Sequence, residues 1–568
     1  MAPAAPPVDL VNVQVNGHWL KFPKGTRMIE ALRQASAEVP HYCYHPKLSS
    51  PGNCRMCLVE TGMPARPAPG TTEVEKDEHG HAKIMWSPRA SIACANTISE
   101  GLGIRTESTL VQECRKGVME FLLINHPLDC PICDQAGECG LQEHAVEHGR
   151  GTSRFEDNKV KKPKHHQIGP RITLDDERCI MCSRCVRFTA EIADDPVLGF
   201  TQRGSYTVLT THPDKELANN YSLNTVDICP VGALTSTDFR FSMRVWFLKE
   251  TKSICTGCAR GCNIEIGSRN DIIHRQTPRE NNAVNSAWMC DAGRLDFHYV
   301  NSEARLTQPN LKENGTHRAA TWAESLAAAA AALQAVPPSQ IAIIASARMT
   351  NEELFLTQRL ANALNVTALD TVPRHGAADA YLVHADKNPN AAGARLIFGT
   401  EPGSQLESIR QRIDRGEITT VLALQENLLA EAGFSPAQLG KLTTLISGHI
   451  LANPSAEHAH IVLPLLATPE KRGSMINATG RLQRLNPATS PAGEARPDWE
   501  VLRDLTLAVS GQNGLYSLED VLKAMATAHP TFTGLNFGKI TDQGLPLLQT
   551  TETIPLLERE KEIGRAHV

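Results

Sequence analysis

The sequence predicts a multidomain protein in which α+β domains precede one α/β region. The first reason is length, because 568 residues are too many to share a single hydrophobic core. The second is that all 16 cysteines lie between Cys43 and Cys290, and that fifteen of them fall, with one histidine, into four groups of four. The third is that strand patterns alternate with helical ones after Cys290, which predicts a parallel sheet with helices on both faces.

Composition and charge exclude some classes of partner. The net charge of -5 gives no reason to expect nucleic acid. Only Lys159 to His166 is strongly basic, and since this stretch contains a proline and no aromatic residue, a solvated linker is favoured over a nucleic-acid site.

The chain shows no targeting or membrane-spanning signal. Met1 to Pro7 lack the charged and apolar segments of a secretory signal, and no run approaches the roughly 18 apolar residues of a spanning helix. We therefore expect a cytoplasmic protein that touches a membrane only through partners. In a reducing compartment, cysteines more often serve as metal ligands than as disulfides.

The first part of the chain predicts a ferredoxin-like domain. Alternating apolar residues from Val11 to Val15, a turn at Asn16-Gly17 and a return strand to Phe22 predict a β-hairpin, and a helix follows over about residues 27–37. These elements and the cysteine loop after them are similar to a plant-type ferredoxin of β-grasp fold, whose ligands hold a [2Fe–2S] cluster. The first gap between cysteines is longer than in the plant-type pattern, and a zinc knuckle is the alternative. The first ligand set is Cys43, Cys54, Cys57 and Cys94.

A helix predicted over residues 108–125 leads to the second set. Leu110, Cys114 and Val118 recur at four-residue intervals, and the apolar pattern continues to Phe121, so we expect Cys114 to be a small buried hydrophobe rather than a ligand. A proline ends the helix at the next histidine, which stands four residues before a Cys-x2-Cys-x5-Cys run that would otherwise offer three ligands. The second set is His126, Cys130, Cys133 and Cys139.

The third set has the spacing of a bacterial ferredoxin. A tight Cys-x2-Cys-x2-Cys triple can wrap one corner of a [4Fe–4S] cluster, and a distant Cys-Pro can supply the fourth thiolate. Zinc is more naturally held by two separated pairs. The third set is Cys179, Cys182, Cys185 and Cys229.

The fourth set stands before the α/β region. Its members are Cys255, Cys258, Cys262 and Cys290. Beyond it, residues 341–345, 419–424 and 461–465 read as buried strands and residues 351–364 as a helix. No Gly-x-Gly-x-x-Gly or Gly-x4-Gly-Lys-Ser/Thr run occurs there, so the chain shows no nucleotide-binding fingerprint of its own. A protein that holds iron–sulfur clusters transfers electrons, which needs no acid, base or nucleophile. We therefore expect no catalytic residue on this chain.

The order of the four sets resembles one family, the large iron–sulfur subunits (G subunits) of bacterial proton-translocating NADH:quinone oxidoreductase, respiratory complex I. The likeness runs from about Val8 to the C-terminus and is sharpest over Phe121 to Gln142. It implies a [2Fe–2S] cluster at the first set and [4Fe–4S] clusters at the other three, the second set having one His and three Cys ligands. It also implies that the first three clusters carry electrons from flavin towards quinone, while the fourth lies off that path.

The resemblance further implies partners and domains. The chain would hold no FMN, NAD or molybdopterin. Its partners would be other peripheral-arm subunits, including the one that binds flavin and NADH, at the cytoplasmic side of the bacterial inner membrane. The implied domains are 1–100 with the [2Fe–2S] cluster, 101–150 with the one-histidine [4Fe–4S] cluster, 151–245 with a ferredoxin-like [4Fe–4S] cluster, 246–302 with a [4Fe–4S] cluster of molybdenum- or tungsten-enzyme type, and 303–568 as a molybdopterin-oxidoreductase-like α/β domain without cofactor.

The C-terminal half is similar to the molybdopterin oxidoreductases. Ala292 stands where catalytic relatives usually carry a lysine, and no later cysteine could ligate a metal, so a cofactor-free scaffold is favoured. The rival interpretations are the large subunit of an NAD-linked molybdenum or tungsten formate dehydrogenase and a zinc-stapled interaction protein. Glu562 to Val568 can be back-translated into a sequencing adapter, so we expect a truncated reading frame. The stretches that carry the likeness are Cys290 to Arg294, Val462 to Pro464, Glu470 to Gly473, Asn477 and Gly480-Arg481.

Overall fold

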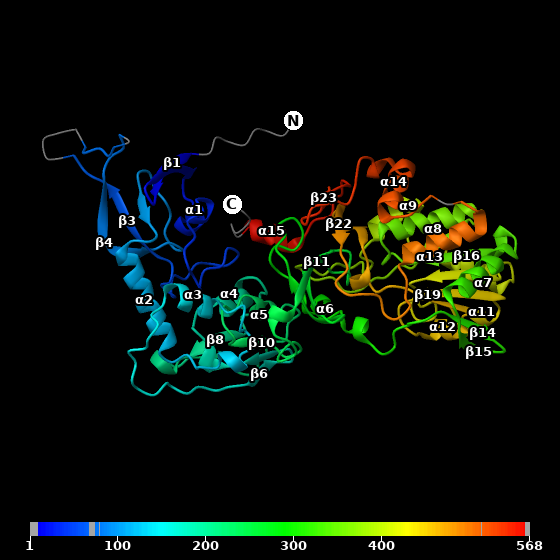
Figure 1. Ribbon diagram of the computed structural model, residues 1–568, viewed down its shortest axis with the longest axis horizontal. Helices are drawn as coiled ribbons and strands as arrows, with labels where there is room; N and C mark the ends of the chain where they lie inside the picture. Colours follow the sequence, from blue (N-terminus) through cyan, green and yellow to red (C-terminus); the bar gives the residue numbers. More distant parts are fainter. Residues whose placement is uncertain (1–8, 68–73, 79, 513, 563–568) are drawn as a thin grey trace. The chain divides into compact units, whose positions relative to one another are not determined.

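The computed structural model describes residues 9–67, 74–78, 80–512 and 514–562. The chain forms two compact units, Met1–Trp246 and Phe247–Val568. Figure 1 shows the first in blue to green and the second in green to red. The residues 563–568 that we expect to be adapter-derived lie outside the described ranges.

A mixed five-stranded sheet of order β2-β1-β5-β3-β4 opens the first unit. The predicted hairpin is confirmed, because β1 and β2 pair antiparallel and Asn16 and Gly17 take φ angles of 47° and 90°, as a type I′ turn requires. Strand β5 pairs in parallel with β1, and α1 packs on the sheet through a core that includes Val13 and Leu32. The bounds are β1 Leu10–Val15, β2 His18–Pro23, α1 Met28–Gln34, β3 Leu58–Pro64, β4 Ile84–Ile92 and β5 Gly103–Arg105.

The predicted helix is present as α2 (Thr109–Leu123), but the prediction of which side of it is buried is partly wrong. Its fully buried residues are Val111, Arg115 and Met119, because the neighbouring strand β3 and helix α3 pack against that side. Phe121 is 80% exposed, and Cys114 is only partly buried. The apolar spacing shows that a helix has a buried side but does not show which neighbours will cover it.

The basic stretch Lys159 to His166 is anchored, which corrects the expectation of a solvated linker. Lys159 Nζ donates to the carbonyl of Leu123 at 2.8 Å, where α2 ends. The last carbonyls of a helix have no partner within it and carry partial negative charge, so an ammonium group there is stabilising. Lys164 Nζ lies 2.6 Å from an Asp129 carboxylate oxygen.

Short helices and two small sheets complete the first unit. The strands form one sheet of order β10-β7-β6 and the antiparallel pair β8-β9. The bounds are α3 Gly140–His148, β6 His166–Gly169, β7 Ile172–Leu174, α4 Arg184–Glu191, β8 Leu198–Thr201, β9 Val208–Thr211, α5 Asn224–Asp227 and β10 Leu234–Ser236.

The second unit begins with a three-stranded antiparallel sheet, β11-β12-β13, followed by the short helix α6. Later in the chain a second small sheet, β21-β22-β23, lies beside β11. The bounds are β11 Lys249–Ile254, β12 Asn263–Arg269, β13 Ile272–Pro278, α6 Asp291–Arg294, β21 Gly473–Ile476, β22 Arg481–Leu485 and β23 Leu545–Pro546.

A seven-stranded sheet of order β15-β14-β20-β19-β18-β16-β17 is the centre of the second unit. Five strands are parallel, as predicted, but β14 and β15 form an antiparallel hairpin at one edge, so the sheet is mixed. The strands are β14 Asn310–Glu313, β15 Thr316–Ala319, β16 Ile341–Ala345, β17 Ala368–Thr371, β18 Thr420–Leu424, β19 Thr444–His449 and β20 Ile461–Pro464.

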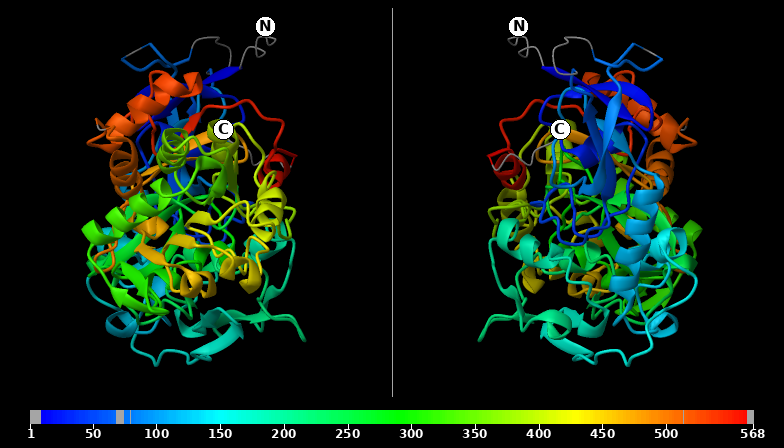
Figure 2. Two further views of the ribbon diagram at one scale, coloured as in Figure 1. Left: turned by 90° about the vertical axis from the view of Figure 1, so that its right-hand side faces the viewer. Right: turned by 90° about the vertical axis from the view of Figure 1, so that its left-hand side faces the viewer.

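Helices cover both faces of this sheet, as predicted. Ile343 and Leu422 face a core with α7, α8, α13 and α14, whereas Ile344 and Val421 face a second core with α10, α11 and α12. In the left view of Figure 2 the yellow strands lie between green and orange helices on one side and yellow helices on the other. The helices are α7 Trp322–Gln334, α8 Asn351–Ala363, α9 Ala391–Phe398, α10 Leu406–Asp414, α11 Pro436–Gly440, α12 Pro454–His458, α13 Asp498–Ser510, α14 Leu518–Ala528 and α15 Pro555–Glu562. None of the helices in the described ranges has the length and apolarity that crossing a bilayer requires.

Candidate metal centres

The first cysteine set meets where the loop between α1 and β3 comes together with the loop after β4. Cys54 contacts Cys43, and Cys94 contacts both Cys43 and Cys57, each at hydrogen-bonding range. Three of the four side chains are fully buried. Contact with Cys43 and then burial raise the pKa of the Cys54 thiol. Three buried thiols and one half-buried thiol at one place form a donor set that fits a [2Fe–2S] cluster, and a Zn²⁺ ion could also use it.

The second set is assembled around the end of α2 and the start of α3. His126 follows α2, Cys130 begins a 3₁₀ turn (Cys130–Ile132), and Cys139 is the N-cap of α3. Burial raises the pKa of the Cys133 and Cys139 thiols, and nearby cysteines add to this, Cys130 acting on both and Cys133 on Cys139. A Cβ on Gly232 would come within 2.3 Å of the Cys133 sulfur, so a side chain there would collide with this candidate ligand.

His126 has the burial and the neutral charge expected of a metal ligand. Its Nδ1 is buried and has no hydrogen-bond partner among the described residues. Burial first, and then the nearby Arg178, lower the pKa of the imidazole to about 4, which keeps the ring neutral. A buried ring nitrogen without a partner is costly unless a metal occupies its lone pair, so the residue fits a one-histidine iron–sulfur site.

Charged side chains surround this second set. Arg178 is almost fully buried and donates to Asp129 at 3.1 Å, and it lies 3.4 Å from Asp175. Asp129 also binds Lys164 at 2.6 Å. Asp129 lies between the histidine and the first cysteine of the set, so these ion pairs hold the ligand-bearing loop in place.

The third set lies at the start of α4 and after α5. Burial raises the pKa of the Cys182 thiol to about 12 and that of Cys185 well above its usual value, and all four thiols lie within electrostatic reach of one another. Thiolates are costly in such a site unless a metal neutralises them. Met181 and Ser183, which flank Cys182, take φ angles of 55° and 62°. This left-handed geometry is unfavourable for residues other than glycine, and here it turns the triple around one point.

The fourth set lies in the second unit, between β11, β12 and α6. Cys255 N–H donates to the Cys262 carbonyl at 2.8 Å, which closes the loop between the two strands. Cys290 is the N-cap of α6, where its sulfur accepts from Gly293 N–H at 3.3 Å. Burial raises the pKa of Cys290 to about 11. A Cβ on Gly293 would lie 2.9 Å from the Cys255 sulfur, so the space between these thiols requires glycine.

All four sets share one local hydrogen-bond pattern. In each, the backbone N–H two residues after a cysteine donates toward its sulfur and favours the thiolate form. N–H groups aimed at cluster sulfurs also stabilise the reduced state of an iron–sulfur cluster. The donors are Met56 for Cys54, Gln135 for Cys133, Met181 for Cys179 and Gly257 for Cys255.

Two arginines that we did not single out from the sequence connect the first and third sets. The guanidinium of Arg187 donates to the carbonyls of Cys43 and Ser49, and at 3.4 Å to that of Cys182. Arg184 donates to the carbonyls of Tyr44 and, at 3.2 Å, of Ile228. Nothing in the local pattern marks these contacts, because their partners lie far away in the chain.

The residues that carry the molybdopterin-type likeness hold the fold together. Lys471 is buried, with its Nζ 3.0 Å from Glu353 and 2.7 Å from Asp498. Glu470 is ion-paired with Arg305 at 2.7 Å. Ala292, in contrast, lies on the exposed side of α6.

Five protein-family models match the chain in order. They are described as 2Fe-2S iron-sulfur cluster binding domain (9–109), NADH-ubiquinone oxidoreductase-G iron-sulfur binding region (115–154), NADH-quinone oxidoreductase subunit 3, ferredoxin-like domain (169–235), Molybdopterin oxidoreductase Fe4S4 domain (248–302) and Molybdopterin oxidoreductase (305–388 and 387–507). These matches confirm the predicted multidomain fold class, with [2Fe–2S] and [4Fe–4S] binding domains before a molybdopterin-oxidoreductase-like region.

Curated relatives that match between 62% and 94% of this chain are named as subunits of NADH-quinone oxidoreductase. The G subunit of that enzyme from Rickettsia conorii is 39% identical over 355 residues, which is 62% of this chain and 49% of that protein. The G subunit from Rickettsia bellii is 30% identical over 647 aligned residues, or 94% of this chain and 91% of that protein. The NADH-quinone oxidoreductase subunit 3 of Thermus thermophilus is 37% identical over 374 residues, or 64% of this chain and 47% of that protein. The matched region thus spans about half the length of the first and third relatives. The chain belongs to the family of NADH-quinone oxidoreductase G subunits.

Proposed function

We propose that this chain is the electron-carrying G subunit of a proton-translocating NADH:quinone oxidoreductase. It would receive electrons that originate in NADH from a flavin-bearing partner and pass them towards quinone. The observation that carries the proposal is that fifteen cysteines and one histidine between residues 43 and 290 fall into four sets, and that all of them except the exposed Cys130 are buried or half-buried.

Each set is assigned one cluster in this proposal. The first set holds [2Fe–2S], and the other three hold [4Fe–4S], the fourth lying off the path to quinone. The proposed domains are 1–100, 101–150, 151–245, 246–302 and 303–568. The ligands would be Cys43, Cys54, Cys57 and Cys94; His126, Cys130, Cys133 and Cys139; Cys179, Cys182, Cys185 and Cys229; and Cys255, Cys258, Cys262 and Cys290.

The chain's own residues position and insulate these sites. Iron–sulfur clusters bound here would supply one-electron transfer. The thiols and His126 would hold the metal, the N–H groups two residues further along donate to the sulfurs, and burial of most of these thiols limits the access of water. Arg187 connects the backbone of the first and third sets, so these two sites are held at a constant separation.

The proposed partners are other peripheral-arm subunits, including the one that binds flavin and NADH. We place the chain at the cytoplasmic side of the bacterial inner membrane, where contact with the membrane runs through those partners. The second unit would act as a scaffold without molybdopterin.

The test uses the full chain, purified and handled without oxygen. Dithionite reduction should produce low-temperature EPR signals of both cluster types. NADH alone should leave the clusters oxidised, because the sequence offers no dinucleotide-binding fingerprint, and NADH with a flavin-bearing partner subunit should reduce them. Reduction by NADH of the flavin-free chain, or the absence of any cluster signal after dithionite, would refute the proposal.

A further inference from the structure

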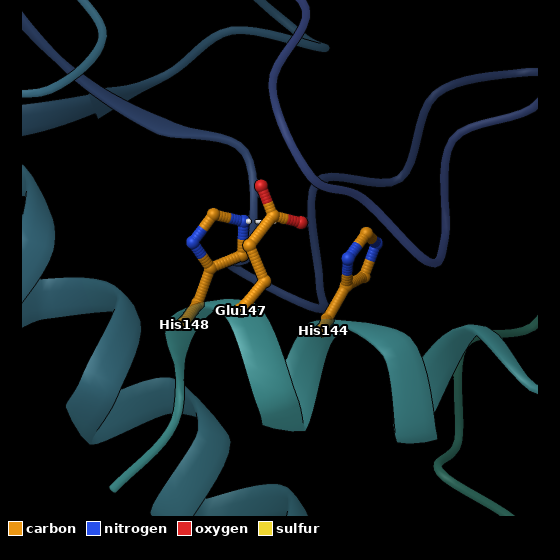
Figure 3. A group of neighbouring side chains, drawn as sticks. All are labelled: His144, Glu147 and His148. Carbon is orange, nitrogen blue, oxygen red and sulfur yellow. Dashed lines mark ion pairs between the residues drawn. The ribbon is translucent and has the colours of Figure 1, made fainter.

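The last turns of α3 present a second kind of donor set, separate from the cysteines. His144, Glu147 and His148 stand at helical positions i, i+3 and i+4, so they share one face of the helix. Their ligand atoms all lie within 4.8 Å of one another. Figure 3 shows the three side chains rising together from the same side of α3.

We propose that His144, Glu147 and His148 form a binding site for one Zn²⁺ ion. Two imidazoles and a carboxylate are donors that Zn²⁺ accepts, whereas Mg²⁺ and Ca²⁺ prefer oxygen ligands throughout. The H-x-x-E-H spacing on a helix is also one of the arrangements by which two histidines grip zinc.

The distances require little rearrangement. Tetrahedral coordination at about 2.0–2.1 Å places donor atoms roughly 3.3 Å apart. The Nε2 of His148 and a carboxylate oxygen of Glu147 are already 3.5 Å apart. The remaining separations of up to 4.8 Å can close by side-chain rotation, because Glu147 is exposed and unconstrained by packing.

His144 is prepared for ligation by its surroundings. Its Nδ1 is buried and lacks a hydrogen-bond partner among the described residues. The backbone carbonyl of His41 is a hydrogen-bond partner of the ring. Because Nδ1 has no partner in the described part of the chain, Nε2 is the nitrogen that donates to this carbonyl. The Tyr42 ring packs against the imidazole in an edge-to-face arrangement, with 5.2 Å between ring centroids. A carbonyl on one nitrogen fixes the tautomer that offers the other nitrogen to a metal.

There is room for further ligands. The site opens into a cavity of about 590 Å³ that is also lined by Glu38, His41 and Arg115. Three protein ligands and one open position are typical of zinc sites that keep a water molecule. A bound ion would also tie the last turn of α3 to its middle, and α3 begins just after Cys139.

The experiment measures zinc in the full, cluster-loaded chain after chelator treatment and desalting. Titration with ZnSO₄ by calorimetry should show about one ion bound per chain, and zinc X-ray absorption should show nitrogen and oxygen neighbours. Glu147→Gln and His148→Ala should each weaken binding at least about tenfold, and the double variant His144→Ala/His148→Ala should abolish it.

A matched control comes from α12. Glu457 and His458 repeat the Glu-His pair at the end of a helix, but Pro454 stands four residues before His458, so the second imidazole is missing. His458→Ala should leave zinc binding unchanged. Cluster EPR signals should persist in every variant, which shows that the fold and the cysteine sites are intact.

Three results would overturn the proposal. One is the absence of zinc binding by the parent chain. Another is binding that Glu147→Gln and His148→Ala leave undiminished. The third is zinc–sulfur contacts near 2.3 Å, because these would place the ion in a cysteine set.

Discussion

His126 differs from the other candidate ligands because its neutral ring adds no negative charge to a cluster. Its buried, unpartnered Nδ1 is the feature that separates it from Cys114, which lies half-buried on α2. A site with one imidazole in place of a thiolate favours the reduced cluster and therefore has a higher potential.

The first prediction compares substitutions of His126 with a substitution of Cys114. Cys114→Ala should leave the EPR signal of the one-histidine cluster intact, while His126→Ala should abolish or reshape it. His126→Cys should keep a cluster of lower potential, because the added thiolate carries negative charge. EPR-monitored redox titration of the full chain measures all three. The opposite outcome for the two alanine variants would transfer the ligand role to Cys114.

The second prediction concerns Arg187, whose guanidinium donates to carbonyls of both the first and the third set. A partly buried cation such as this one stabilises the more negative, reduced state of a neighbouring cluster. Arg187→Gln should therefore lower the potentials of both adjoining clusters, and Arg187→Lys should lower them less because the charge is kept. The exposed Arg154, paired with Glu120 on α2, supplies the control Arg154→Gln. Equal potentials in the parent and Arg187→Gln would contradict the electrostatic role.

At the scale of elements, the second unit is held by buried charges as well as by its apolar cores. Lys471 connects α8, through Glu353, with α13, through Asp498. Glu353 also closes the capping box with Thr350 at the start of α8. The lysine therefore compensates two buried carboxylates at once, and burial together with Asp498 raises the pKa of Glu353 to about 7.

The third prediction removes that lysine. Lys471→Met should lower the free energy of unfolding of the second unit by about 3–5 kcal/mol, because two carboxylates then remain buried without a cation. The neighbouring Arg472 forms an exposed pair with Glu519, so Arg472→Met should cost only about 0–1 kcal/mol. Urea unfolding followed by circular dichroism compares the two variants. Similar losses of unfolding free energy in the two variants would show that the buried ion pairs of Lys471 stabilise the unit no more than the exposed pair of Arg472 does.

At the scale of the whole molecule, the fourth prediction is the metal content. The proposed clusters require about 14 iron atoms per chain. Molybdenum and tungsten should stay at background, and zinc should not exceed about one ion, which the double variant His144→Ala/His148→Ala removes. Elemental analysis of the anaerobically purified chain measures these contents together. Molybdenum or tungsten with a released pterin would favour the formate dehydrogenase interpretation, and zinc bound to sulfur without cluster EPR would favour a zinc-stapled protein.

Candidate ligands and local elements could be predicted from the sequence because both depend on short-range chemistry. Sulfur and imidazole are the donors that iron–sulfur sites use, and their spacing is visible along the chain, as for Cys179 to Cys185. The Asn16-Gly17 turn and the buried strand Ile341–Ala345 were predictable for the same reason.

Contacts between distant segments were decided only by the tertiary structure. The hydrogen bonds of Arg187, the link from Lys471 to two helices, the antiparallel edge formed by β14 and β15, and the exposed position of Phe121 leave no periodic trace in the sequence. The spacing of His144, Glu147 and His148 was visible, but its neighbouring cavity was not. Local spacing determines which side chains can share one face or one turn, whereas packing of separate elements determines which of those faces meet a neighbour and which remain open.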